Sequence, residues 1–144
     1  MRLTSTAFAH EGDIPARYTC DGDDVSPPLA IEGLPPETVS LVLVMDDPDA
    51  PAGTWDHWVA YDIEPTAQVP EAIGSLGTPG TNSWGRSGYG GPCPPRGTHR
   101  YVFAVYALDR RIGWDAGADK GAVLAEMHGH VLAEATLAGF YSRE

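Results

Sequence analysis

A short stretch rich in glycine and proline, Gly88 to Tyr101, leads directly into the most strand-like segment of this chain, Arg100 to Leu108. It holds four glycines and three prolines, together with Cys93 and His99. Proline fixes φ and removes an N–H donor, whereas glycine lets another group approach the backbone closely. The stretch is therefore predicted to be a loop that ends where the strand begins. Because His99 and Tyr101 flank Arg100, a strand turns both side chains to the same face.

This loop has two interpretations. Its glycines suit a ligand that meets main-chain amides with no side chain in the way. The same composition is typical of a connecting loop in which glycine and proline only direct turns. The loop alone does not decide between them.

A second segment, upstream, combines a strand with a stiff acidic loop. Val39 to Met45 is a continuous apolar run with one serine, which predicts a buried strand. It leads into Asp46-Asp47-Pro48-Asp49-Ala50-Pro51, where each proline favours extended geometry in the residue before it. A carboxylate placed here can orient an imidazole such as His57 by holding one ring nitrogen. Taken singly, His57 is more often a structural histidine than a ligand-binding one.

The remaining pattern predicts an all-β fold with one helix. The segment Glu64 to Thr98 contains no convincing regular element, and Ala118 to Thr136 has apolar residues at helical spacing, with Gly129 as a potential break. We therefore expect residues 1–144 to form a single all-β domain, a sandwich of antiparallel-rich sheets with a peripheral C-terminal helical segment. The strands expected are Arg2–Phe8, Leu29–Ile31, Val39–Met45, His57–Ile63, Arg100–Leu108 and Gly139–Ser142.

The charge of the chain argues against several classes of partner. The formal net charge is −11, and Lys120 is the only lysine. Nucleic-acid binding needs a basic surface, and adsorption to anionic membranes needs a polybasic patch. No apolar run approaches the roughly 20 residues of a membrane span, and the N-terminal residues show no signal-peptide pattern. We expect a cytoplasmic protein without nucleic acid or stable membrane insertion, whose two cysteines, Cys20 and Cys93, are by default reduced.

Taken together, the two central segments resemble the phosphatidylethanolamine-binding protein family. The resemblance rests on Asp47-Pro-Asp-Ala-Pro51, the His-Trp strand that follows it, and Gly91-Pro-Cys-Pro-Pro-Arg-Gly-Thr-His-Arg-Tyr101. It is closest to the compact bacterial and archaeal branch, often called Raf-kinase-inhibitor-like. Tyr18 to Leu29 resembles the N-terminal signature of that branch, and Gly129 to Ala135 resembles its C-terminal helix. The resemblance covers nearly the whole chain. Since both cysteines lie in these motifs, a disulfide between them stays an alternative to reduced thiols.

The resemblance implies a small pocket for phosphate-like anions. Imidazoles, a phenol and loop amides can supply hydrogen-bond donors to phosphate oxygens. Asp47 cannot face an anion without repulsion, so we expect it to orient His57 or His99; the alternative is that it only caps a turn. Carried over residue by residue, the expected ligand-binding positions are Asp47, Pro51, His57, Gly91, Cys93, Pro95, His99 and Tyr101.

These residues favour a non-catalytic binding protein over two alternatives. The binding protein takes a small anionic or phosphorylated ligand, with a kinase or protease as a protein partner in some family members. The first alternative is a hydrolase in which Cys93 is the nucleophile and His57 or His99 the base. The second is an interaction protein that acts through a homodimer surface and has a vestigial pocket. We expect no cofactor and no metal, because the prolines near Asp46, Asp47 and Asp49 give a spacing unlike a calcium loop.

Overall fold

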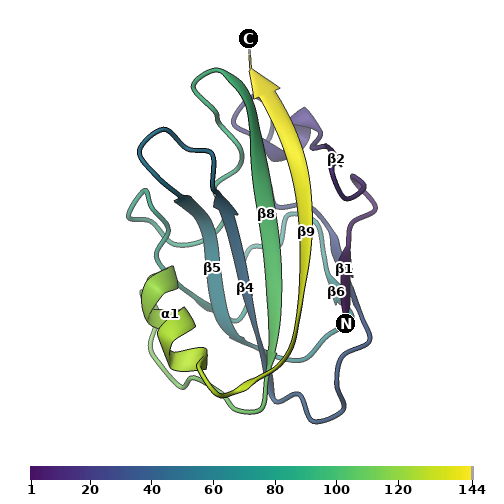
Figure 1. The fold of residues 1–144 in the computed structure, drawn as a ribbon, viewed down its shortest axis with the longest axis vertical. Coiled ribbons are helices and arrows are strands. Elements are labelled where there is room, and N and C mark those ends of the chain that lie inside the picture. Colours follow the sequence, from purple (N-terminus) through teal and green to yellow (C-terminus); the bar gives the residue numbers. More distant parts are fainter. Residues whose placement is uncertain (144) are drawn as a thin grey trace.

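Two β-sheets form the frame of the protein in the computed structural model, which describes residues 1–143 (Figure 1). The smaller sheet has three strands in the order β1-β3-β6, and the larger has six in the order β2-β9-β8-β4-β5-β7. The small sheet consists of β1 (Arg2–Thr4), β3 (Leu29–Glu32) and β6 (Gln68–Val69). The large sheet consists of β2 (Gly12–Asp13), β9 (Val131–Arg143), β8 (Gly97–Leu108), β4 (Ser40–Asp47), β5 (Trp55–Ile63) and β7 (Thr78–Pro79). A 3-10 turn (Ala16–Tyr18) and one α-helix, α1 (Lys120–Met127), complete the elements.

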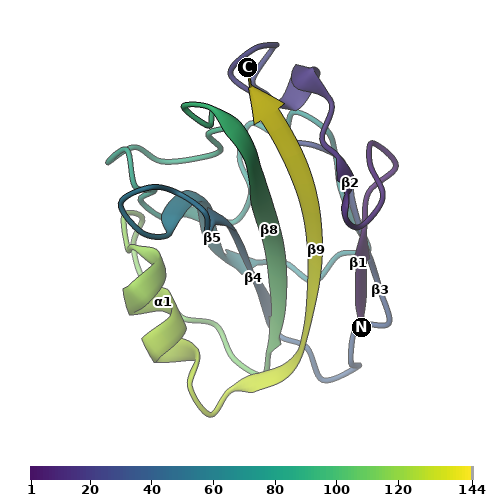
Figure 2. The same ribbon diagram turned by 45° about the horizontal axis from the view of Figure 1, so that its top comes forward.

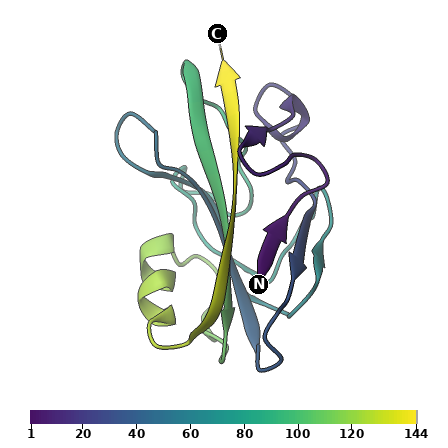
Figure 3. The ribbon, with the colours of Figure 1, turned by 45° about the vertical axis from the view of Figure 1, so that its right-hand side comes forward.

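The continuous apolar run of β4 is explained by burial on both of its faces. Leu41, Leu43 and Met45 belong to the larger core cluster, which also contains side chains from the small sheet. Val42 and Val44 belong to a second cluster together with Val123 and Met127 of α1. In Figure 3 the small sheet and α1 lie on opposite sides of the large sheet. A strand between two packed layers has no solvent face, so it has no polar alternation.

Helix α1 is attached to the large sheet by charge as well as by apolar packing. The Asp119 carboxylate caps the helix by accepting from the backbone N–H of Ala122 at 2.9 Å. The ammonium group of Lys120 lies 3.1 Å from a carboxylate oxygen of Asp46 on β4 and 2.8 Å from one of Asp56 on β5. The only lysine of the sequence thus joins the first turn of the helix to two neighbouring strands.

The β-rich class and the three central strands predicted from the sequence are confirmed. Antiparallel β4 pairs with β5 on one side and with β8 on the other. The predicted strands at Leu29–Ile31 and Gly139–Ser142 correspond to β3 and to part of β9. The region Glu64 to Thr98 is largely irregular, as expected, except for the two-residue strands β6 and β7 and the first two residues of β8.

The helix predicted over Ala118 to Thr136 is wrong in its second half. Helix α1 ends at Met127, and residues Val131–Arg143 form the longest strand, β9. The segment Gly129 to Ala135, which resembles a C-terminal helix in the family, is therefore mostly strand. Gly129 has φ +82°, a value that ends a right-handed helix.

The spacing of the apolar residues after Gly129 is compatible with both a helix and a strand. In a helix Val131 and Leu132 would join the core, but in β9 they are 41% and 38% exposed. Burial along β9 instead begins at Leu137. Twelve registered pairs with β8 hold β9 in place, and short-range helical spacing does not compete with this pairing.

The N-terminal segment closes the outer edge of β9 (Figure 2). Strand β2 pairs in parallel with Gly139 and Phe140 of β9. A Cβ atom at Gly139 would lie 2.6 Å from Ile14 and 2.8 Å from Phe8, so this position needs glycine for close packing rather than for an unusual φ. Within residues 1–143, no helix has the length and apolar character needed to cross a membrane.

Two leucines of β9 test the corrected assignment. Leu137 is 2% exposed, so Leu137→Ala leaves a cavity in the core and should lower the free energy of unfolding by about 2–5 kcal/mol. Leu132→Ala removes a side chain that is 38% exposed and should change the free energy of unfolding by less than about 1 kcal/mol. Urea denaturation measures both. Equal losses would contradict the strand and favour the predicted helix.

Candidate functional site

A pocket of about 500 Å³ opens where β4 ends and where β5 and β8 begin. Its wall includes the chain around Cys20 and Asp24 as well as the glycine-proline loop before β8. Seven of the eight residues predicted from the sequence line it: Asp47, Pro51, His57, Gly91, Cys93, Pro95 and His99. Because β4 lies between β5 and β8, the two neighbouring strands β4 and β5 and the distant strand β8 bring their side chains to one place.

Asp47, the last residue of β4, performs both roles that the sequence left open. One carboxylate oxygen accepts a hydrogen bond from the backbone N–H of Asp49 at 2.8 Å, which closes the turn after the strand. The other lies 2.7 Å from Nδ1 of His99. Asp47 and His99 are both buried, at 4% and 8% exposure. The carboxylate therefore stabilises the turn and orients His99 at once.

His57 is oriented by the glycine-proline loop instead of by a carboxylate. Its Nδ1 lies 2.7 Å from the carbonyl oxygen of Gly90, and the backbone N–H of Gly90 donates to the His57 carbonyl at 3.0 Å. A carbonyl oxygen only accepts, so Nδ1 carries the proton. Burial lowers the pKa of His57 below the ordinary histidine value, and the Gly90 carbonyl offsets this only in part.

Tyr101 lies behind the two imidazoles and does not line the pocket. Its ring centroid is 5.3 Å from that of His57, edge to face, and 6.4 Å from that of His99 in a stacked arrangement. The side chain is fully buried, and its hydroxyl has no hydrogen-bond partner of good geometry among the described residues. Burial, with the nearby Asp47 carboxylate, raises the pKa of the phenol. Its expected place on the ligand-facing wall is therefore a correction: Tyr101 supports both histidines from beneath.

The two central glycines of the loop serve packing between protein segments. A Cβ atom at Gly90 would collide with the Trp84 ring, and one at Gly91 would collide with the Tyr18 carbonyl and the Asp24 carboxylate. The N–H of Gly91 already donates to Asp24 at 2.8 Å. The expectation that this loop offers free amides to a ligand is thus wrong for Gly90 and Gly91.

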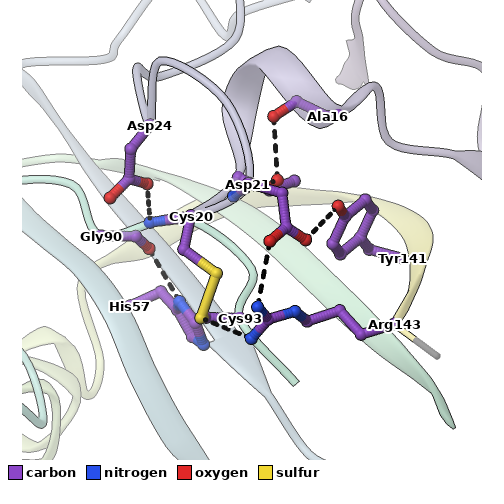
Figure 4. The surroundings of a disulfide bond; sticks show 11 residues. Ala16, Cys20, Asp21, Asp24, His57, Gly90, Cys93, Tyr141 and Arg143 are labelled. Carbon is purple, nitrogen blue, oxygen red and sulfur yellow. Dashed lines mark hydrogen bonds and ion pairs between the residues drawn. A yellow bond between two sulfur atoms is a disulfide. The ribbon is translucent and has the colours of Figure 1, made fainter. Parts of the chain in front are cut away.

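Cys20 and Cys93 form a disulfide bond, so the default prediction of two reduced thiols is wrong (Figure 4). Their Cα atoms are 5.4 Å apart, and the bond joins positions separated by 73 residues. Both cysteines line the pocket. The bond fastens the segment that carries Asp24 to the loop that holds His57, and the backbone N–H of Cys20 also donates to the Pro92 carbonyl at 3.1 Å.

A charged group from the end of β9 lies against the disulfide. The guanidinium of Arg143 is 3.4 Å from the sulfur of Cys93 and 3.1 Å from the Asp21 carboxylate. The Tyr141 hydroxyl donates to the other oxygen of Asp21 (Figure 4). These contacts connect the N-terminal loop to β9 as well as to the pocket.

Several lining residues were not predicted. Trp55 and Trp84 meet edge to face at 5.6 Å, and Trp84 lies 4.9 Å from His57 in the same manner. The guanidinium of Arg86 lies over the Trp84 ring at 5.6 Å and lines the pocket. Nothing in the irregular loop marks Arg86, whereas Cys20 and Asp24 stand in the N-terminal motif that carried the resemblance.

Comparisons with known proteins agree over almost the whole chain. A family model described as phosphatidylethanolamine-binding protein matches residues 4–142. The UPF0098 protein of Methanothermobacter thermautotrophicus is 50% identical over 99% of both chains. The UPF0098 protein of Pyrococcus horikoshii is 46% identical, over 97% of this chain and 76% of its own.

Solved structures give the same result. The crystal structure of CT736, a phosphatidylethanolamine-binding protein homolog from Chlamydia trachomatis, has a TM-score of 0.96 at 40% identity, covering 99% of this chain and 97% of the other. That of YbcL from E. coli, described as a member of the mammalian family, has a TM-score of 0.90 at 27% identity, with 99% and 98% covered.

The disulfide is expected to stabilise the fold. Replacing both Cys20 and Cys93 by serine removes a cross-link across 73 positions and should lower the free energy of unfolding by about 2–4 kcal/mol. Denaturation of the wild type with and without a reductant provides the matched comparison. A double variant as stable as the oxidised wild type would contradict this expectation.

The burial of His57 predicts a loss of stability in acid. The unfolded chain gains a proton at an ordinary histidine pKa, about 6.5, whereas the folded protein resists protonation to lower pH. The contribution of neutral His57 to the free energy of unfolding is therefore complete above about pH 6.5. It is lost as the pH falls toward the lower pKa of the folded state.

Unfolding free energies of the wild type and His57→Gln, measured from pH 7.5 to 5, test this effect. The wild type should lose more stability over this range, by up to about 1.4 kcal/mol per pH unit from one proton. Parallel curves for the two proteins would show that His57 does not titrate as expected.

Proposed function

Because the chain belongs to the phosphatidylethanolamine-binding protein family, whose fold binds ligands, we propose that its pocket binds a phosphate-like anion or a phosphorylated ligand without catalysis. The observation that carries the proposal is the pair of buried, oriented imidazoles, His57 and His99, in one pocket with Arg86. Oriented ring nitrogens and a guanidinium are groups that bind phosphate oxygens.

The electrostatics support binding of moderate strength. Arg86 adds a positive charge to the pocket wall. Among the described residues it has no carboxylate within ion-pair distance, which leaves its donors for a ligand. Its position over Trp84 holds the planar guanidinium beside the wall formed by the two tryptophans.

The size of the pocket supports a ligand larger than a free anion. A volume of about 500 Å³ lies in the range of sites for small organic molecules. Trp55, Pro51 and Ala52 supply an apolar wall for the organic part of such a ligand. The chemistry common to all candidates is a phosphate-type group at the histidines.

The hydrolase alternative finds no support. A nucleophilic cysteine must be a thiolate, whereas the sulfur of Cys93 is bonded to that of Cys20. A regulatory effect on a protein partner such as a kinase or protease, and a homodimer, stay predictions for pull-down and sedimentation experiments. The cytoplasmic location also stays a prediction, to be tested by cell fractionation. The test matters here because the protein has a disulfide, and disulfides persist mainly in oxidising compartments.

Calorimetric titration with inorganic phosphate and with phosphoethanolamine tests the proposed function. His57→Ala should weaken the binding of both by about 10- to 150-fold, the range for one hydrogen bond to a charged group. His130→Ala is the control for loss of an imidazole, since the His130 ring pairs with Asp109 at 2.9 Å and lies outside the pocket.

The control variant should bind as the wild type does. Absence of binding by the wild type, or equal effects of the two substitutions, would rule out this anion site.

A further inference from the structure

The ring nitrogens left for a ligand are acceptors while the histidines are neutral. In His57 the Nδ1 proton is committed to the Gly90 carbonyl, and in His99 it is committed to the Asp47 carboxylate. A neutral imidazole has one N–H, so Nε2 of each ring then carries a lone pair. These two hydrogen bonds to the protein are both made through Nδ1. A ligand at these atoms meets acceptors, which do not bind a bare oxyanion.

The charged side chains of the pocket wall also favour a ligand that keeps a proton. Asp24 and Asp47 are acidic and Arg86 is basic, so carboxylates exceed guanidinium groups by one. The Arg86 charge attracts any anion. The two carboxylates repel a fully ionised anion more strongly than one that keeps a proton.

We propose that the pocket selects oxyanions that carry an acidic proton, and that Nε2 of His57 accepts the hydrogen bond from the ligand hydroxyl. The inference rests on the proposed function and adds the protonation state of the ligand to it. Phosphate belongs to the preferred class, because its dianion still has one P–OH group. Sulfate, a dianion of similar size and shape, has none.

The alternative, a protonated His57 that donates to a bare oxyanion, is opposed by the environment of this ring. Burial lowers the pKa of His57, so adding a second proton costs free energy. The groups around the ring carry both signs of charge. The titratable and charged ones are Asp46 and Asp47 on β4, His99 and Tyr101 on β8, and Asp24 and Arg86 from the loops. The carboxylates among them favour the charged ring, but burial is the larger effect.

The comparison of two dianions is the primary test. At pH 8, in buffer of constant ionic strength without other oxyanions, the wild type should bind inorganic phosphate at least tenfold more tightly than sulfate, the factor expected when one hydrogen bond to a charged group is lost. Sulfate binding within about threefold of phosphate would overturn the inference and leave the proposed function intact. If neither anion binds, the proposed function itself fails.

Methyl phosphate provides a second test that needs no variant. Its dianion has lost the acidic proton, with a pKa of about 6 for a phosphate monoester. Its affinity should therefore fall about tenfold per pH unit from pH 7 to pH 8, while the affinity for inorganic phosphate changes much less. Titrations in two buffers of different ionisation enthalpy should show uptake of about one proton per methyl phosphate at pH 7. Binding without proton uptake would overturn the inference.

His57→Gln connects the selectivity to one side chain. A glutamine amide offers an N–H donor as well as an acceptor, so the variant should bind phosphate and sulfate within about threefold of each other. His130→Gln, the same substitution outside the pocket, should keep the wild-type ratio. Thermal melting checks that both variants fold. A folded His57→Gln protein with undiminished preference for phosphate would assign the selectivity elsewhere and overturn the role of His57.

Discussion

The burial of β4 on both faces is the constraint on which the rest of the structure depends. Its odd-numbered side chains fill the core between the sheets, and its even-numbered ones pack under helix α1. The strand therefore cannot slip by one residue without placing each set in the wrong layer. This fixed register sets Asp47 in the wall of the pocket, between the strands that carry His57 and His99. The packing of β4 thus fixes the position of Asp47, and Asp47 in turn orients His99 in the pocket.

Much of this arrangement could be predicted from local patterns, and the failures have physical causes. Short segments of the sequence are enough to recognise the apolar run of β4 and the motifs that contain His57, His99 and Asp47. By contrast, Val131 to Ala135 fit a helix and a strand equally well until pairing with β8 decides between them. The positions of Tyr101, behind the histidines, and of Arg86, over Trp84, depend on contacts between distant segments. The disulfide likewise depends on a proximity that composition and an expected compartment cannot reveal.

The glycine-proline loop shows why residue type alone gives an incomplete account of a site. Glycine at positions 90 and 91 is consistent with close approach of a ligand, and close approach is indeed required there. The approaching groups are, however, the Trp84 ring and the chain near Tyr18 and Asp24. The loop thereby becomes a rigid support that presents the Gly90 carbonyl to His57. The loop contributes to the pocket by fixing the tautomer of His57. This effect is smaller and more specific than a supply of free amides to a ligand.

The pairing of the N-terminal segment with β9 also restricts the order in which the chain can acquire its structure during synthesis. Residues Gly12 and Asp13 find their strand partners only at Gly139 and Phe140, and β8 lacks one of its two neighbours until β9 exists. While the ribosome is still making the first 130 residues, the edge of β8 and the apolar side chains Phe8 and Ile14 have no partner on β9. Exposed strand edges of this kind favour association between chains. Until β9 has been made, the nascent protein therefore exposes an edge of β8 that is paired in the finished fold.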